Sequence, residues 1–207
     1  MKTNIRKVAV LGSGVMGSAI ACHFANVGCS VLLLDIVPKE AEETDKKAAR
    51  NKLVNDALKA SLKSKPSPIY SKSFANRIET GNMTDDMNKI ADCDWIIEVV
   101  VERLDIKKIV FENVEKYRKP GTLITSNTSG IPIHTMLEGR SDDFKQHFCG
   151  SHFFNPPRYL KLLEIIPTPE TKQSVVDFLM DYGSKILGKT TVLCKDTPAF
   201  IANRVGV

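Results

Sequence analysis

The sequence of 207 residues contains no apolar run close to the roughly 20 residues that a membrane-spanning helix needs. A strong charge imbalance is also absent, since 29 Lys and Arg stand against 24 Asp and Glu and the excess is dispersed. These absences argue against membrane insertion and nucleic-acid binding, while the mild positive charge suits a small anionic ligand. The first residues, MKTNIRK, lead straight into an apolar stretch, so we predict no signal or transit peptide.

Cysteine pairs and metal-ligand spacings are missing as well. The five cysteines are scattered without a CxxC spacing, and the four histidines stand at no metal-ligand spacing from them. We therefore expect no metal site, and a reducing, cytoplasmic setting. The cysteines that lie in or beside apolar runs, where small buried residues are common, are Cys22, Cys93, Cys149 and Cys194.

What the sequence does contain is a glycine-rich turn between two apolar runs. The run Val8–Leu11 predicts a buried strand, Val15–Asn26 predicts a helix that stops near Gly28, and Val31–Leu34 predicts a second strand. The glycines between the first strand and the helix have the spacing GxGxxG. A strand, a helix and a second strand around this spacing are typical of a dinucleotide-binding unit.

Each part of this pattern has a physical role in binding a dinucleotide. Gly12 allows the tight turn, Gly14 lets the backbone approach a pyrophosphate, and Gly17 lets helix and strand pack closely. The N-terminus of the helix offers free N–H groups and a positive dipole end to the phosphates. Asp35 ends the second strand, where a carboxylate can hold the ribose hydroxyls, and no arginine follows it directly. The pattern therefore favours NAD over NADP, although glycines that serve packing alone would look the same. The expected cofactor contacts in this segment are Gly12, Gly14, Val15, Met16, Gly17 and Asp35.

Strand and helix patterns alternate along the rest of the chain and predict an α/β fold. We expect a Rossmann-type, doubly wound and mostly parallel sheet, with helices on both faces and ligands at the carboxyl ends of the strands. The charged stretch at about 38–66 predicts one long helix or a helix pair that projects from the sheet after the second strand. The further predicted elements are strands Arg77–Gly81, Asp94–Val101, Thr122–Ser126, His147–Phe154, Leu162–Ile166 and Thr190–Cys194, and helices Thr84–Ala91, Leu104–Tyr117 and 170–187.

The chain ends inside an apolar segment without the signals that stop a helix. We therefore interpret residues 1–195 as one domain, including the helical arm at about 38–66. Residues 196–207 are interpreted as the start of a linker into a further domain.

If the cofactor is NAD, oxidation of an alcohol also requires a base for the hydroxyl proton. A histidine suits this role, and a buried carboxylate can fix its tautomer. His152 and Glu164 lie 12 residues apart on what we predict to be adjacent strands. Taken alone, His152 could be a structural core histidine and Glu164 a strand residue that faces solvent.

Several motifs together resemble one known family. The series GSGVMGS, E-x-x-x-E-R-L, SNTSG, HFFNPP-x-x-x-K-L-L-E-I-I and KDTPAFIANR runs through nearly the whole chain. In order and spacing it is similar to the NAD-binding domain of 3-hydroxyacyl-CoA dehydrogenases, notably the form that opens bacterial multifunctional fatty-acid β-oxidation proteins. The resemblance implies NAD-dependent oxidation of (S)-3-hydroxyacyl-CoA to 3-oxoacyl-CoA.

Carried over to matching positions, the resemblance implies four catalytic residues. His152 would be the general base and Glu164 its partner. Ser129 would hydrogen-bond the 3-oxygen of the substrate, and Asn203 would complete the site. A histidine, a serine and an asparagine kept together argue against a non-catalytic NAD-binding protein. The histidine and glutamate argue against a β-hydroxyacid dehydrogenase of the 6-phosphogluconate type, for which a catalytic lysine would be expected.

The resemblance also implies binding residues. Glu102 and Lys107 match positions near the nicotinamide and its ribose, and we place Asn127 of the SNTSG motif with them. The arm would meet the CoA nucleotide through Lys59 and Lys63, although a solvated helix face is the alternative reading of these lysines. In the family, a helical C-terminal domain completes the acyl-CoA site and forms the homodimer. We therefore expect the chain alone to have weak activity or none.

The sequence departs from the family at two places. Pro157-Arg158-Tyr159 stands where apolar residues are common after HFFNP, and the serine motif ends in Gly130 where many members have a second serine. Both departures leave the chemistry intact and leave the acyl-chain preference open.

Overall fold

The computed structural model describes residues 4–206 and contains one eight-stranded sheet in the order β3-β2-β1-β4-β5-β6-β7-β8. All neighbouring strands are parallel except β6 and β7, which are antiparallel. The predicted α/β fold with a mostly parallel sheet is therefore confirmed. Residues 1–3 and 207 lie outside the described part. The first three belong to the stretch for which we predicted no signal peptide, and residue 207 belongs to the predicted linker. The strands are β1 (Lys7–Leu11), β2 (Ser30–Asp35), β3 (Ile78–Asn82), β4 (Trp95–Glu98), β5 (Leu123–Ser126), β6 (Phe148–Phe153), β7 (Leu162–Pro167) and β8 (Thr190–Leu193).

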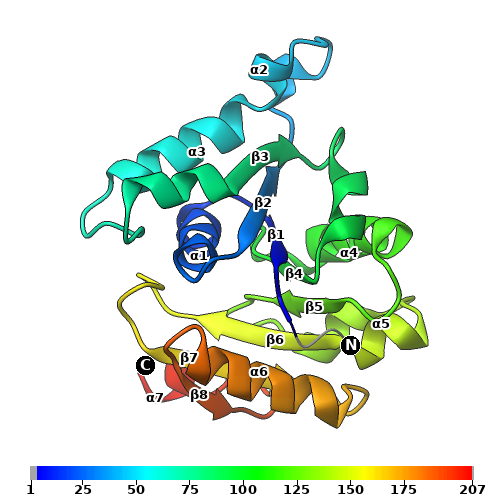
Figure 1. Cartoon of the computed structure of the whole chain (residues 1–207). Helices are drawn as coiled ribbons and strands as arrows, with labels where there is room; N and C mark the ends of the chain where they lie inside the picture. The colour runs from blue at the N-terminus through cyan, green and yellow to red at the C-terminus, as the bar shows by residue number, and fades with distance from the viewer. Residues whose placement is uncertain (1–3, 207) are drawn as a thin grey trace.

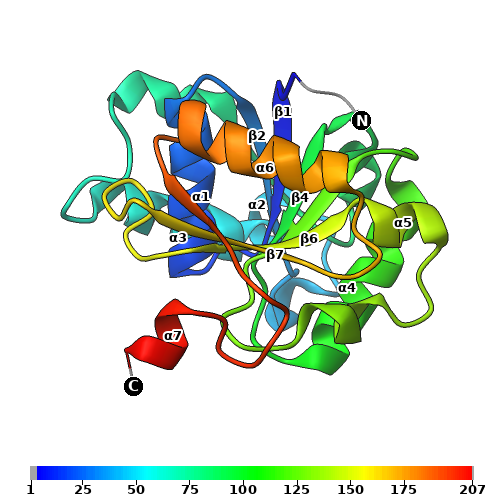
Figure 2. The same cartoon turned by 90° about the horizontal axis from the view of Figure 1, so that it is seen from below.

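Helices cover both faces of the sheet, as expected from parallel strands joined by crossovers (Figures 1 and 2). The first and sixth helices pack on one face, and the fourth and fifth pack on the other. The α-helices are α1 (Val15–Asn26), α2 (Lys47–Arg50), α3 (Lys52–Lys63), α4 (Leu104–Tyr117), α5 (Asp142–Gln146), α6 (Gln173–Lys185) and α7 (Ala202–Val205). The 3₁₀ helices are η1 (Lys39–Ala41), η2 (Lys72–Arg77), η3 (Met87–Asp92) and η4 (Ile133–Leu137).

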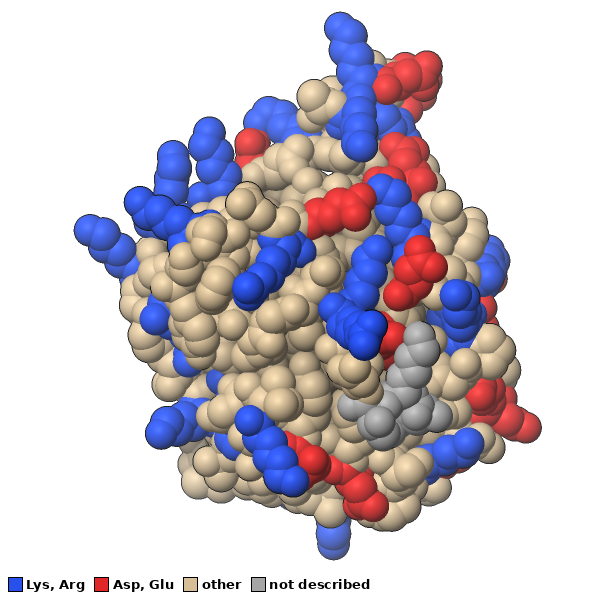
Figure 3. Space-filling model, in the orientation of Figure 1, with Lys and Arg blue, Asp and Glu red and all other residues tan. Residues whose placement is uncertain are grey.

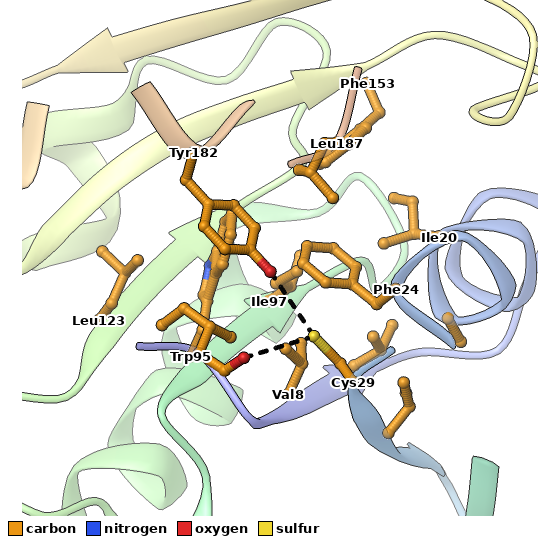
Figure 4. Close-up of a cluster of buried hydrophobic side chains, with 14 of the residues drawn as sticks. Val8, Ile20, Phe24, Cys29, Trp95, Ile97, Leu123, Phe153, Tyr182 and Leu187 are labelled. Carbon is orange, nitrogen blue, oxygen red and sulfur yellow. Dashed lines mark hydrogen bonds between the residues drawn. The ribbon is translucent and has the colours of Figure 1, made fainter. Parts of the chain in front are cut away.

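Two hydrophobic clusters, one on each face, hold these layers together. On the face of α1 and α6, Phe24 and Tyr182 pack edge to face against Trp95 at centroid distances of 5.1 and 5.8 Å. Figure 4 shows Cys29 in the same cluster, with its Sγ 3.6 Å from the Tyr182 hydroxyl. All five cysteines are buried and unpaired, so the expected burial of Cys22, Cys93, Cys149 and Cys194 is confirmed and Cys29 shares it.

The predicted arm is a short helix followed by a longer one, which agrees with the helix-pair alternative (Figure 1). Helix α3 packs across α1 and buries Val54, while most of its remaining side chains stay at least partly exposed. Only one edge of the arm is therefore held by the core.

Two predicted elements end differently from the expectation. The helix expected at Thr84–Ala91 is a turn followed by 3₁₀ helix η3, because the Asn82 amide oxygen accepts the N–H groups of Thr84 and Asp85. The strand expected to reach Val101 stops at Glu98, whose carboxylate accepts the N–H of Val100 at 2.7 Å. The other predicted ends lie within three residues of those observed.

The end of β4 carries a buried ion pair that sequence reasoning missed. Glu98 is 0% exposed and Lys107, on α4, is 1% exposed, with 2.8 Å between Nζ and Oε1. The hydroxyl of Ser126 donates to the second oxygen of Glu98 at 2.5 Å. This carboxylate therefore joins β4, α4 and β5, and an acid that closes an apolar strand is the sequence signal for it.

Lys107→Met is expected to lower the free energy of unfolding by about 3–5 kcal/mol, because it leaves the Glu98 carboxylate charged and buried without its partner. Chemical denaturation measures this loss. The double variant Glu98→Gln/Lys107→Met should regain much of it, since no single charge is then buried. A Lys107→Met protein as stable as wild type would refute the role given to the pair.

The turn after β1 depends on two of its glycines. Gly12 has φ +106°, and a Cβ there would lie 2.4 Å from the carbonyl oxygen of Val99. A Cβ at Gly17 would lie 1.9 Å from the carbonyl oxygen of Gly12. The predicted tight turn and close packing are therefore present.

Gly17→Ala should destabilise the protein by about 1–3 kcal/mol or more, because the Cβ would meet backbone atoms that cannot move aside freely. Gly14→Ala is the matched control, since Gly14 has φ −57° and no atom within 4 Å of a Cβ. Its unfolding free energy should stay within about 0.5 kcal/mol of wild type. Equal thermal stability of the two variants would argue against the packing role of Gly17.

Candidate active site

His152 on β6 stands directly opposite Glu164 on β7 in the antiparallel pair. Opposite residues project from the same face of a sheet, so the side chains meet, with 2.7 Å between Nδ1 and Oε2. Both are buried, at 6% and 1% exposure. The predicted contact between the two side chains is therefore present.

The carboxylate of Glu164 also holds the C-terminal segment. Its second oxygen accepts the N–H groups of Ile201 and Ala202 at 3.1 and 2.8 Å. With Nδ1 of His152 facing a carboxylate, the ring proton belongs on Nδ1, which leaves Nε2 as the proton acceptor. The pair thus has the arrangement of a base and its orienting acid.

A cavity of about 370 Å³ opens in front of His152. Ser129 follows β5, and Asn203 on α7 donates from its amide nitrogen to the Ser129 carbonyl oxygen at 2.9 Å. Asn127 accepts the N–H of Phe153 at 2.9 Å. The predicted site residues that line this cavity together are Met16, Asn127, Ser129, His152 and Asn203.

Glu102 holds the loop that carries Ser129, and Lys107 pairs with Glu102. Glu102 accepts hydrogen bonds from the Thr128 hydroxyl and from the N–H groups of Ser129 and Gly130. Burial raises the pKa of Glu102, but the hydrogen bonds from Thr128 and Ser129 and the charge of Lys107 lower it, so the pKa lies below its usual value. Lys107 is directed to Glu98 and Glu102 and does not line the cavity.

The glycine-rich turn provides a second surface suited to a dinucleotide. Helix α1 begins after Gly14 without a side-chain cap, and a Cβ at Gly14 would meet open space. Asp35 lies beside this turn, because one of its oxygens accepts both the N–H and the hydroxyl of Ser13. Open backbone at a helix N-terminus beside a carboxylate fits the pyrophosphate and ribose of NAD.

A cavity of about 480 Å³ lies between the start of α1 and the arm. Lys59 and Lys63 are exposed on α3 and do not line it, whereas Lys65 does. Figure 3 shows Lys and Arg gathered over the side of the molecule where α3 lies. The arm therefore presents positive charge, although its cavity is bordered by a lysine other than the two predicted.

Three residues near the site escaped the sequence analysis. Lys189, which precedes β8, is 6% exposed, and burial lowers its pKa to about 8. Phe200 has φ 49° and packs its ring 5.9 Å from that of His152. Asp196 accepts the N–H groups of Ile133 and His134. Asp196 and Phe200 both lie in the motif KDTPAFIANR, so each had a signal, whereas Lys189 had none.

Within residues 4–206, no helix is long and apolar enough to cross a membrane. The same part of the chain holds no group of three or more side chains that could bind a metal ion.

Comparison with known proteins places the chain in one family. Residues 7–197 match the model of the 3-hydroxyacyl-CoA dehydrogenase, NAD binding domain. The chain is 54% identical to a "Probable 3-hydroxyacyl-CoA dehydrogenase" of Bacillus subtilis, over 100% of this chain and 27% of that protein. It is 47% identical to a protein of the same description from Deinococcus radiodurans, over 98% and 57% of the two chains.

A solved structure supports the same assignment. The 3-hydroxybutyryl-CoA dehydrogenase of Escherichia coli K12 matches with a TM-score of 0.76 and 32% identity, over 98% of this chain and 41% of that one. The chain thus spans about a quarter to somewhat over half of the length of these relatives. Glycine turn, buried pair and comparisons agree: the chain belongs to the 3-hydroxyacyl-CoA dehydrogenase family and constitutes its NAD-binding domain.

Proposed function

We propose that the protein oxidises (S)-3-hydroxyacyl-CoA to 3-oxoacyl-CoA with NAD, as a step of fatty acid β-oxidation. The observation that carries the proposal is the buried His152–Glu164 pair, which faces the cavity that Ser129 and Asn203 share. A base at a cavity beside a dinucleotide turn is what removal of hydride and proton from an alcohol requires.

Bound NAD would accept the hydride from the substrate carbon. In this proposal, Nε2 of His152 takes the hydroxyl proton, and the Glu164 carboxylate balances the charge of the imidazolium. The hydroxyl of Ser129 hydrogen-bonds the 3-oxygen of the substrate. The side-chain amide of Asn203 holds the loop by donating to the backbone carbonyl oxygen of Ser129. Glu102 holds the same loop by accepting the N–H of Ser129.

The cofactor would lie along Gly12–Gly17, with Asp35 on the adenosine ribose. Oδ2 of Asp35 already accepts two hydrogen bonds from Ser13. Oδ1 accepts only one, from the N–H of Ile36 at 2.7 Å, so it can accept a further hydrogen bond from a ribose hydroxyl. A 2′-phosphate would be repelled by this carboxylate, which supports a preference for NAD over NADP.

Properties beyond this domain are also proposals. The relatives are longer than this chain, which supports the proposal that residues 196–207 connect the domain to further sequence. Full activity and a homodimer would depend on that sequence. The domain alone would then turn over weakly. Five buried thiols support a reducing compartment such as the cytoplasm.

Asp35→Ala should weaken NAD binding by about 1–3 kcal/mol, the value of a lost charge-assisted hydrogen bond. Isothermal titration calorimetry measures the affinity, with Asp181→Ala on α6 as an exposed control. Gly14→Ala should weaken NAD binding while keeping wild-type stability, because its Cβ would occupy the open space at the turn. Unchanged NAD affinity in Asp35→Ala would remove Asp35 from the site.

His152→Ala should lower kcat of the full-length gene product by roughly 10²–10⁴, the usual contribution of a general base, with little effect on NAD affinity. Glu164→Gln should also lower kcat, because an amide can hold the ring but cannot balance its charge. Together the two changes should cost much less than the product of the single losses. Steady-state kinetics of the four proteins test this.

His134→Ala is the matched control for the pair. Its ring also lies 2.6 Å from a carboxylate, that of Asp196, but it does not line the cavity of His152. This variant should keep wild-type kcat. Losses that simply multiply for His152 and Glu164 would show that the two residues act independently.

A further inference from the structure

The segment from Asn155 to Leu160 lies in the connection between β6 and β7, and its first residues border the two cavities described above. Asn155 borders both the cavity of His152 and the cavity beside the arm. Under the proposed function, the substrate joins these cavities, because its nucleotide lies near the arm and its acyl end near His152. The position of this segment therefore sets the path between the two ends of the substrate.

Arg158 fastens the segment to residues 67–70, the stretch that directly follows the arm. Its Nη1 donates to the carbonyl oxygens of Ser67 and Ile69, both at 2.8 Å. The guanidinium lies over the rings of Tyr70 and Tyr159, at 4.6 and 5.0 Å from their centroids. Since a guanidinium is planar and always charged, it can donate and stack at once, which a lysine cannot reproduce.

This stretch after the arm is itself held by α1. Asn26 donates from Nδ2 to the Pro68 carbonyl oxygen at 2.9 Å and accepts the N–H of Tyr70 through Oδ1 at 2.7 Å. The hydroxyl of Tyr159 adds a bond to the Ser67 carbonyl oxygen at 2.8 Å. The segment is thus connected, through residues 67–70, to α1, the helix whose N-terminus borders the glycine turn.

Lys189 holds the same segment from the side of β8. Its ammonium donates to the carbonyl oxygens of Pro157 and Leu160, the latter at 2.7 Å. Because Lys189 is buried, these two carbonyls offset part of the cost of desolvating its ammonium. Arg158, within the six-residue segment, and Lys189, outside it, therefore both hold it in place.

We propose that Arg158 is a positioning residue for acyl-CoA: it fixes the stretch that ends the arm to the segment beside His152, so that nucleotide and acyl end are held at one separation. This role rests on the proposed function. If the role is correct, loss of Arg158 slows the reaction only for a substrate that spans both cavities. A wrong position of the acyl end relative to the nucleotide lowers the rate only when both ends are bound.

The test compares a 3-hydroxyacyl-CoA with the same acyl group on N-acetylcysteamine, a thioester without the nucleotide. In the full-length gene product, Arg158→Ala should lower kcat/KM for the CoA ester by roughly tenfold or more and leave the short thioester within about twofold. Tyr159→Phe should act in the same direction with a smaller loss. Lys185→Ala, on the exposed side of α6, is the control.

NAD affinity of the variants should match wild type, since the hydrogen bonds of Arg158 go to the carbonyl oxygens of Ser67 and Ile69 and not to the glycine turn. Thermal unfolding, measured alongside, should show every variant still folded at the assay temperature. Equal losses for both thioesters would assign Arg158 a general structural role and overturn the proposal, as would no loss with the CoA ester. Wild-type protein that oxidises neither thioester would overturn the proposed function, and with it this role of Arg158.

Discussion

The arrangement of the site depends on the carboxylate of Glu164. One oxygen faces the ring of His152, and the other accepts two backbone N–H groups at the start of α7. The same group therefore orients the candidate base and holds the segment that brings Asn203 to the loop of Ser129. A buried carboxylate needs such donors, because each unmet acceptor in this interior would cost free energy. Its need for partners is what brings three distant parts of the chain together.

The same principle operates at other strand ends. Asp35 closes β2 and holds the glycine turn through Ser13, while Glu98 closes β4 and accepts from Lys107, Ser126 and the backbone. The order of the sheet reverses between β1 and β4, where the carboxyl ends of the strands leave a crevice. Acids at these ends stabilise the loops that border the crevice, so structural carboxylates and candidate ligand-binding residues share one edge of the sheet.

The fold and the centre of the site could be predicted because they rest on local signals. Alternating strand and helix patterns give the sheet, and Gly12 and Gly17 are required by backbone contacts that only glycine permits. A histidine and a glutamate on adjacent apolar strands are expected to contact each other, because buried polar side chains need partners. The pair of Glu98 and Lys107 gave a weaker signal, because each residue alone is compatible with an exposed position. Nothing in the sequence around Lys189 indicates that its ammonium would be buried under a distant loop.

Arg158 illustrates why the departure from the family pattern could not be interpreted from the sequence. Placed after HFFNP, it raised a question about acyl-chain preference, since the residues before it belong to the site. In the structure its partners are carbonyls about 90 residues earlier, and neither Arg158 nor Tyr159 lines the cavity of His152. The apolar residues that line that cavity are Met16, Val99, Val100, Phe153 and Phe154. The change in sequence therefore affects the contact with residues 67–70 and leaves the apolar lining of the cavity unchanged.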